Sequence, residues 1–350
     1  MTKETSTGTT ADTMLALDEL EVHFHATGSR WAWSRKLPPI RAVDGVTLNV
    51  ARGETAAIVG ESGSGKSTVA RSILGLIAPT SGSVRFDGID LRSLSGSALT
   101  DFRRSVQLVF QNPYSSLHPR KRIGQIIEEP LEILTTMTRF QRQSKVRELL
   151  SEVGLRPEHE SAYPSAMSGG QRQRVAIARG IATGARLLVL DEPVSALDVS
   201  VRAQVLNLLE RLKHELDLTY IFISHDLAVV RGFCDTINVM YSGKLVESGP
   251  ANEVFERPGH PYTRALISAI PIPDPVVESQ RQRIRLEGEP PSTRFPPTGC
   301  RFRTRCPLAQ QICADVEPPL KSIGQNRLSA CHFSREVLQA QETRTGGARR

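Results

Sequence analysis

The sequence predicts an α/β protein built on a mostly parallel sheet with helices on both faces. Strand and helix patterns alternate along the middle of the chain, which is the element order of such sheets. Residues 187–190 and 219–223 are short, almost entirely apolar runs, as expected of strands buried on both faces. A third strand pattern, residues 55–59, leads into a glycine-rich loop and then a helix pattern from residue 67.

The glycine-rich loop predicts a phosphate-binding site. Residues 60–68 match the P-loop pattern G-x-x-x-x-G-K-[ST]. Its glycines let the backbone turn tightly and point N–H groups at phosphate oxygens. Lys66 would reach the β- and γ-phosphates, and the Ser67 hydroxyl would bind Mg²⁺. The nucleotide-binding residues predicted here are Gly60, Glu61, Ser62, Gly63, Ser64, Gly65, Lys66, Ser67 and Thr68. The alternative, a glycine-rich turn without a ligand, does not explain the flanking strand and helix.

Length and composition are those of a globular protein. The 350 residues suffice for about two domains. The first 14 residues lack the apolar segment of a signal peptide, and no run approaches the ~18 apolar residues of a membrane span. We therefore expect a cytoplasmic chain. The net charge of +7 is spread among acidic residues, so we expect no nucleic-acid partner.

Composition divides the chain into four parts. Residues 1–14 are polar and are predicted to be disordered. Residues 15–255 form the α/β core, with a helical subdomain at about 112–172. Residues 256–335 form a small, irregular, proline-rich extension that contains a cysteine cluster, and residues 336–350 form a flexible tail.

Further elements follow in order along the core. The predicted strands of a β-rich subdomain are residues 15–24, 46–50 and 83–86. The other predicted elements are a strand at 106–110, helices at 128–134, 140–153, 172–181 and 200–216, and a β-hairpin at 239–246.

Two carboxylates follow the apolar strand 187–190. Ligands of open α/β sheets bind at the carboxyl ends of the strands, so Asp191 is predicted to hold Mg²⁺. Glu192 comes next and is predicted to act as a base or to position the attacking water. A solvated turn is the alternative for such a pair, and the buried strand before it argues against that alternative.

These motifs together resemble the ATP-binding subunits of ABC transporters, over about residues 15–335. The resemblance implies a P-loop NTPase fold with the ABC ATPase core. Gln111 matches the Q-loop glutamine, which senses Mg²⁺ and the γ-phosphate, and His225 matches the switch histidine. Phe24 aligns with the aromatic residue that stacks on adenine, with Trp31 or Trp33 as alternatives.

The resemblance also implies that two subunits share each ATP. The family signature appears as Ser168, Gly169, Gly170 and Gln171, preceded by Met167 where Leu is commoner. In the family this segment contacts the γ-phosphate of ATP bound to the opposite subunit. Asp198 ends the segment that matches the D-loop, which crosses the dimer interface. We therefore expect ATP hydrolysis in a head-to-tail dimer with a second homologous ATPase subunit.

The extension resembles that of oligopeptide and dipeptide importers, nearest to the F-type ATPase subunit of oligopeptide permeases. The resemblance lies in residues 257–266, 287–292 and 299–307. It implies two transmembrane permease subunits, an extracytoplasmic peptide-binding protein, and a peripheral position on the cytoplasmic face of the membrane. Residues 114–127 would contact the permease.

Four of the five cysteines lie close together in the sequence, with the spacing C-x5-C-x6-C-x17-C: Cys300, Cys306, Cys313 and Cys331. This set resembles the cysteines of the family's C-terminal domain, which can hold an iron–sulfur cluster. Four thiolates suit a [4Fe–4S] cluster or Zn²⁺, and reduced or disulfide-linked thiols are the alternative. The isolated Cys234 is predicted to be an ordinary buried residue.

Three other functions remain open at this point. The first is an importer ATPase for nickel or another small solute. The second is an ABC ATPase acting on nucleic acid or ribosomes, although the chain has one P-loop and no long heptad region. The third is a metal-dependent regulator with a vestigial ATPase. Cargo length, the pairing of the subunits and the activity of the second ATP site are not fixed by the sequence.

Overall fold

An eight-stranded sheet forms the centre of the molecule in the computed structural model, which describes residues 12–25, 37–111, 116–271, 274–280 and 283–339. The strands lie in the order β11-β12-β10-β9-β3-β8-β7-β6. Neighbours from β9 to β6 run parallel, and β10, β12 and β11 add antiparallel pairs. The strands are β3 (Thr55–Val59), β6 (Val106–Val109), β7 (Leu187–Asp191), β8 (Thr219–Ser224), β9 (Thr236–Tyr241), β10 (Lys244–Pro250), β11 (Lys321–Gly324) and β12 (Arg327–Ser329).

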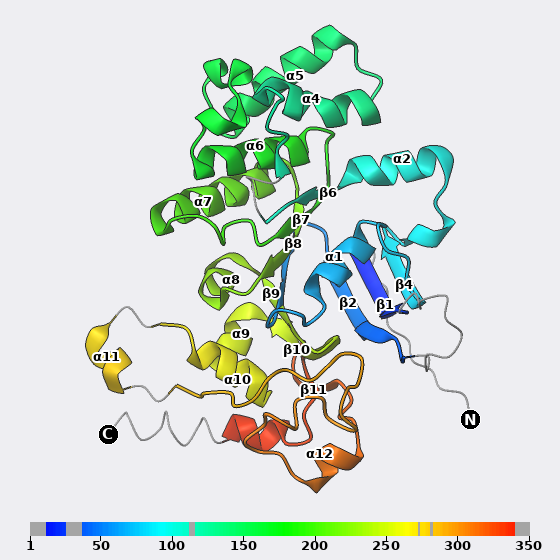
Figure 1. Cartoon of the computed structure of the whole chain (residues 1–350), viewed down its shortest axis with the longest axis vertical. Helices are drawn as coiled ribbons and strands as arrows, with labels where there is room; N and C mark the ends of the chain where they lie inside the picture. Colours follow the sequence, from blue (N-terminus) through cyan, green and yellow to red (C-terminus); the bar gives the residue numbers. More distant parts are fainter. Residues whose placement is uncertain (1–11, 26–36, 112–115, 272–273, 281–282, 340–350) are drawn as a thin grey trace.

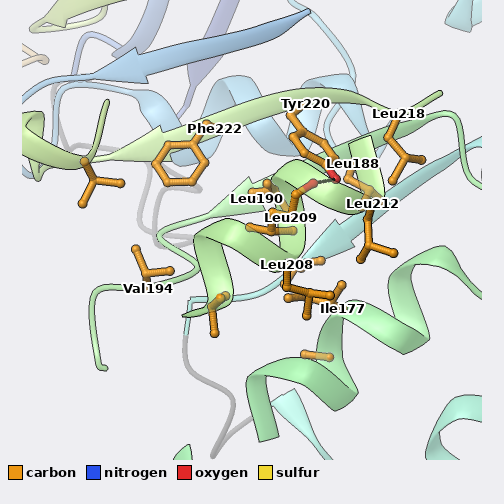
Figure 2. Close-up of a cluster of buried hydrophobic side chains, with 14 of the residues drawn as sticks. Ile177, Leu188, Leu190, Val194, Leu208, Leu209, Leu212, Leu218, Tyr220 and Phe222 are labelled. Atoms are coloured by element: carbon orange, nitrogen blue, oxygen red, sulfur yellow. Dashed lines mark hydrogen bonds between the residues drawn. The ribbon is translucent and has the colours of Figure 1, made fainter. Parts of the chain in front are cut away.

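Side chains of β7 and β8 alternate between two cores, as period-2 strands covered on both faces must. On one face, Tyr220 and Leu188 pack against the helices α6 (Gly169–Ile181) and α7 (Val199–Glu215) (Figure 2). The Tyr220 hydroxyl donates to the Leu209 carbonyl at 2.8 Å, so this buried polar group is satisfied. The opposite face packs on α1 (Lys66–Ile73) and on a smaller sheet. The expected covering of both faces is therefore present.

The smaller sheet is antiparallel and has the order β2-β1-β4-β5. Its strands are β1 (Thr13–Phe24), β2 (Ile40–Ala51), β4 (Ser81–Phe86) and β5 (Ile89–Asp90), and α2 (Gly96–Ser105) follows them. Because β1 begins at Thr13 and Met14 is buried, the prediction that residues 1–14 are all disordered is wrong for Thr13 and Met14. Met14 supplies apolar surface to the core, which the polar residues before it cannot do.

A helical layer stands above the sheet (Figure 1). It contains α4 (Ile123–Leu134), α5 (Arg139–Glu152) and α6. The helix predicted at 140–153 is present almost as expected. The helix predicted at 128–134 begins five residues earlier and runs through Pro130, because the apolar residues on both sides of the proline are buried in one core.

The extension folds back beneath the sheet (Figure 1). Its helices are α10 (Pro261–Ser268), α11 (Pro275–Gln280) and α12 (Gln311–Asp315), and α8 (Leu227–Phe233) and α9 (Ala251–Glu256) precede them at the end of the core. Strand β12 pairs with β10, and the buried Arg327 guanidinium binds the Glu247 carboxylate at 3.3 Å. The extension is thus joined to the central sheet by a strand pair and an ion pair.

Residues 334–339 are helical, and the Val337 side chain is completely buried. The prediction of a flexible tail from residue 336 is therefore wrong for residues 336–339. Within the described ranges, no helix combines the length and the apolar character needed to cross a bilayer.

Candidate nucleotide-binding site

The P-loop connects β3 to α1, as its sequence context predicts. Three of its glycines have positive φ angles, among them Gly60 at 154° and Gly65 at 109°. A Cβ at Gly60 would lie 2.2 Å from the Met240 carbonyl oxygen, and one at Gly65 would lie 2.3 Å from that of Ala42. Only glycine fits these positions, because neighbouring backbone occupies the space of a side chain.

Lys66 is the first residue of α1 and is buried. Its ammonium donates to the carbonyl oxygens of Gly60 at 2.7 Å and Glu61 at 2.9 Å. Burial lowers the pKa of Lys66, and the nearby carboxylates of Glu192, Asp191 and Glu61 oppose that shift. The Lys66 side chain is therefore held inside the loop, where phosphate oxygens would meet it.

The three predicted catalytic side chains outside the P-loop meet at one edge of the sheet. Gln111, Glu192 and His225 follow the adjacent parallel strands β6, β7 and β8. The Gln111 amide Nε2 donates to Glu192 Oε2 at 2.6 Å, and His225 Nδ1 lies 2.9 Å from Glu192 Oε1. Glu192 has a φ of 48°, and its N–H donates to the Ile223 carbonyl on β8 at 2.9 Å. Contacts of both the backbone and the side chain of Glu192 thus fix the position of its carboxylate.

Asp191 ends β7 beside these groups. Burial raises the pKa of its carboxyl and Glu192 adds to the rise, whereas Lys66 and Arg71 act in the opposite direction. The charged form of Asp191 is therefore disfavoured where it stands. A bound cation would favour it.

An open pocket of about 660 Å³ joins these groups to the smaller sheet. Its lining residues are Phe24, Ile40, Ala42, Ser62, Gly63, Gly65, Lys66, Ser67, Thr68, Gln111, Glu192, His225 and Thr293. Phe24 is 41% exposed at the end of β1, where a ring can stack on a base. The alternative aromatics Trp31 and Trp33 lie outside the described residues.

Sequence reasoning missed Thr293, which belongs to the extension. Its carbonyl accepts from the Arg41 N–H at 3.0 Å, beside Ile40 and Ala42. The next residue, Arg294, donates to the Pro38 carbonyl at 3.2 Å. The extension therefore completes the end of the pocket that Phe24 lines, and no motif signals this contact.

The predicted signature and D-loop residues do not line this pocket. Ser168 is the N-cap of α6, where its hydroxyl accepts from the Gln171 N–H at 3.3 Å. A Cβ at Gly170 would lie 2.4 Å from Val201 Cγ1. The packing of Val201 therefore accounts for a glycine at this position. Asp198 is the N-cap of α7, and the adjacent Val199 is 80% exposed. One chain therefore does not bring its signature segment to its own P-loop.

The four late cysteines lie near one another in the fold. The N–H of Cys300 donates to the Cys313 carbonyl at 2.8 Å. Burial raises the pKa of Cys331 to about 12 and that of Cys306 to about 11, and the neighbouring thiols add to both shifts. None of these four cysteines forms a disulfide. Cys234 is buried elsewhere, as predicted.

Two family profiles match the chain. One, for ABC transporters, covers residues 43–195, and the other, for the C-terminal region of oligopeptide/dipeptide transporters, covers residues 246–313. The oligopeptide transport ATP-binding protein OppF of Escherichia coli is 47% identical over 320 residues, 90% of this chain and 95% of the relative. The chain belongs to the oligopeptide/dipeptide family of ABC transporter ATP-binding proteins.

Other members of the family are similarly close. The dipeptide transport ATP-binding protein DppF of Escherichia coli is 46% identical, covering 93% of this chain and 96% of the relative. AppF, an oligopeptide transport ATP-binding protein of Bacillus subtilis, is 45% identical, covering 93% and 99%. The alternative of a vestigial ATPase is not supported, since this ABC ATPase retains the residues that meet around Glu192.

Solved structures agree with the fold. The dimeric ATP-binding cassette MJ0796, bound to ADP and phosphate, has a TM-score of 0.59 at 30% identity and covers 68% of this chain and 99% of its own. The CbiO1 protein of Clostridium perfringens has a TM-score of 0.60 at 28% identity, covering 70% and 91%. The predicted P-loop NTPase core of the ABC ATPase type is confirmed.

Proposed function

We propose that this ABC ATPase powers the import of oligopeptides or dipeptides across a membrane. The observation that carries the proposal is the match of residues 246–313, which include most of the extension, to the C-terminal region of oligopeptide/dipeptide transporters. The names of the similar relatives, which transport oligopeptides and dipeptides, support it. An importer for nickel or another small solute is the second candidate, which the transport assay below distinguishes from a peptide importer.

The pocket's own residues supply the steps of hydrolysis. Lys66 and the P-loop N–H groups bind the phosphates. Glu192 accepts a proton from the attacking water, and Gln111 and His225 orient the Glu192 carboxylate through the contacts at 2.6 Å and 2.9 Å. Catalysis is then mainly positioning together with charge stabilisation in a fixed polar site.

The residues at the phosphate end fit Mg²⁺. Ser67, Gln111 and Asp191 offer hydroxyl, amide and carboxylate oxygens, the hard ligands that Mg²⁺ prefers. Burial also raises the pKa of the Asp191 carboxyl, and a bound cation would favour its charged form. When bound, Mg²⁺ neutralises charge on the β- and γ-phosphates.

A second ATPase subunit would complete each site. The signature residues 168–171 and Asp198 lie outside the pocket of their own chain, and Val199 is exposed beside Asp198. A homologous partner in head-to-tail arrangement would place its signature segment over this P-loop. Two permease subunits and an extracytoplasmic peptide-binding protein would form the rest of the complex, with this chain at the cytoplasmic face of the membrane.

The cysteine group would hold a metal centre, and the placement of its sulfurs does not match a compact zinc site. Zn–S bonds of about 2.3 Å place the sulfurs of a tetrahedral site about 3.8 Å apart. Among the described residues, no three of the cysteine sulfurs all lie within 4.8 Å of one another. A [4Fe–4S] cluster takes four thiolate ligands. Because burial raises the pKa values of Cys306 and Cys331, protons would leave these thiols as metal binds.

Iron, sulfide and zinc analysis of the anaerobically purified chain tests the metal centre. We expect about four iron and four sulfide per chain. Stoichiometric zinc without sulfide would overturn the cluster, and neither metal would overturn a metal centre altogether. The ATPase proposal does not depend on this result.

Copurification tests the transporter. The tagged chain is extracted from membranes in mild detergent, and the proteins bound to it are identified. We expect two permease subunits and a second ATPase, and vesicles of that complex should accumulate labelled di- to oligopeptides with ATP. Accumulation of nickel but not peptide would favour the second candidate. Recovery of ribosomal or nucleic-acid-binding proteins alone would overturn the transporter.

A further inference from the structure

One loop of the extension reaches the P-loop. Residues 299–307, here called the cysteine loop, contain two arginines whose guanidinium groups bind carboxylates of the ATPase core. Arg301 binds Asp44 on β2, and Arg305 binds Glu61. Glu61 is the second residue of the P-loop. The two arginines therefore connect a segment far along the chain to the phosphate-binding loop.

The Arg305–Glu61 contact is a two-pronged ion pair. Arg305 Nη1 donates to Glu61 Oε2 at 2.8 Å, and Nη2 donates to Oε1 at 3.3 Å. The Arg305 side chain is 7% exposed and that of Glu61 is 28% exposed. Paired donors on both carboxylate oxygens fix orientation as well as distance. Partial burial also reduces screening by salt.

Glu61 is in turn part of the lysine's surroundings. Its carbonyl accepts from Lys66 Nζ at 2.9 Å, and its N–H donates to the Tyr262 hydroxyl at 2.9 Å. The Glu61 carboxylate also acts electrostatically on Lys66, whose pKa it helps to keep up against burial. If Arg305 did not bind the Glu61 carboxylate, this carboxylate would be free to compete with phosphate for the Lys66 ammonium.

The cysteine loop is held firmly against the core. The Arg301 guanidinium binds the Ser242 carbonyl as well as Asp44. The next residue, Gly243, donates its N–H to the Ser64 carbonyl of the P-loop at 2.9 Å. The turn between β9 and β10 is thus placed between the two loops and contacts both.

Aromatic packing adds to this attachment. Phe302 is 1% exposed, and its ring centroid lies 5.2 Å from that of Tyr241 and 5.4 Å from that of Tyr262. Tyr262 is the residue whose hydroxyl binds the Glu61 N–H. The backbone that carries Arg305 is therefore held in place by packing, so the side chain loses little conformational entropy when it binds Glu61.

We infer that Arg305 is a positioning residue for ATP binding, which acts through Glu61 to hold the P-loop and to keep the Glu61 carboxylate away from Lys66. Arg305 is not among the residues that line the nucleotide pocket. The inference concerns ATP binding by this chain and is independent of the transported cargo.

The test is a double-mutant cycle on the full-length chain, with MgATP as the probe. Arg305→Ala should raise the KM for ATP by about tenfold, the effect of losing one hydrogen bond between charged groups, with kcat changed far less. Adding Glu61→Gln to Arg305→Ala should recover most of the loss, because the competing charge is gone. Arg305→Lys, which keeps the charge but not the paired donors, should fall between.

Arg303→Ala is the matched control. Arg303 lies in the same loop, but its guanidinium donates to the Thr298 carbonyl at 2.9 Å within the extension, so the KM should not change. A wild-type KM in Arg305→Ala would overturn the inference. Equal defects in the single and double variants would also overturn it, because a purely structural role is not rescued by removing the charge of Glu61. If Arg305→Ala does not fold, Arg305→Lys with and without Glu61→Gln gives the same comparison.

Discussion

Replacing Glu192 by glutamine isolates the proposed proton acceptor. Glutamine has nearly the same shape as glutamate, and an amide can still meet the Gln111 amide and the His225 ring, which lie 2.6 Å and 2.9 Å from the carboxylate oxygens. What the change removes is the negative charge and the ability to accept a proton from water. The P-loop and its Lys66 are untouched.

The magnitude follows from the role. A positioned general base contributes about 10²–10⁴-fold to a rate, which corresponds to about 3–5 kcal/mol of barrier. We expect kcat to fall within that range. ATP affinity should not fall, because Glu192 places a negative charge beside Lys66 and Asp191, and removing it cannot weaken the binding of an anion.

Phosphate release measures kcat, and equilibrium titration with ATP measures affinity. Glu256→Gln is the matched control, since Glu256 is exposed at the end of α9, and it should behave as wild type. A Glu192→Gln kcat within about threefold of wild type would refute the base assignment, since that is far below the smallest contribution expected of a general base. Loss of ATP binding together with turnover would refute the geometric reasoning.

Three further outcomes follow. Thr293→Trp should raise the KM for ATP by about tenfold with little change in kcat, because Thr293 lines the pocket beside Phe24. Gly60→Ala should abolish ATP binding, since its Cβ would lie 2.2 Å from the Met240 carbonyl. His260→Asn should make the fold less sensitive to acid, because complete burial lowers the pKa of His260 to about 3. Below about pH 6.5 the unfolded state of the wild type therefore binds more protons at this residue than the folded state does. This difference costs the wild type about 2 kcal/mol of stability by pH 5, a loss that the variant does not have.

Each outcome has a control and a contrary result. Gly232→Ala, in open space on α8, should bind ATP normally, and unaltered binding by Gly60→Ala would contradict the steric argument. Thr293→Ser should match wild type. A normal KM for ATP in Thr293→Trp would contradict the placement of Thr293 in the nucleotide pocket. Unfolding midpoints between pH 7 and pH 5 test His260, and parallel curves for both proteins would contradict the prediction.

Local chemistry made most of the site predictable. The P-loop is contiguous, so its glycines, Lys66 and Ser67 are positioned by a strand, a turn and a helix that are neighbours in sequence. Glu192 could be placed because it directly follows a fully apolar strand. The meeting of Gln111 and His225 with Glu192 follows from these strands being parallel and adjacent, which the family resemblance implied.

Contacts across long stretches of chain could not be read from any local pattern. Thr293 reaches the pocket, and Arg305 reaches Glu61 across 244 residues, only because the extension folds back under the sheet. Thr293 lies outside the segments that carry the resemblance. Arg305 lies inside one of them, residues 299–307, but an arginine beside a cysteine has the same local pattern whether or not it binds a distant carboxylate. Pattern and propensity describe a few neighbouring residues at a time, whereas these partners are chosen by packing of the whole chain.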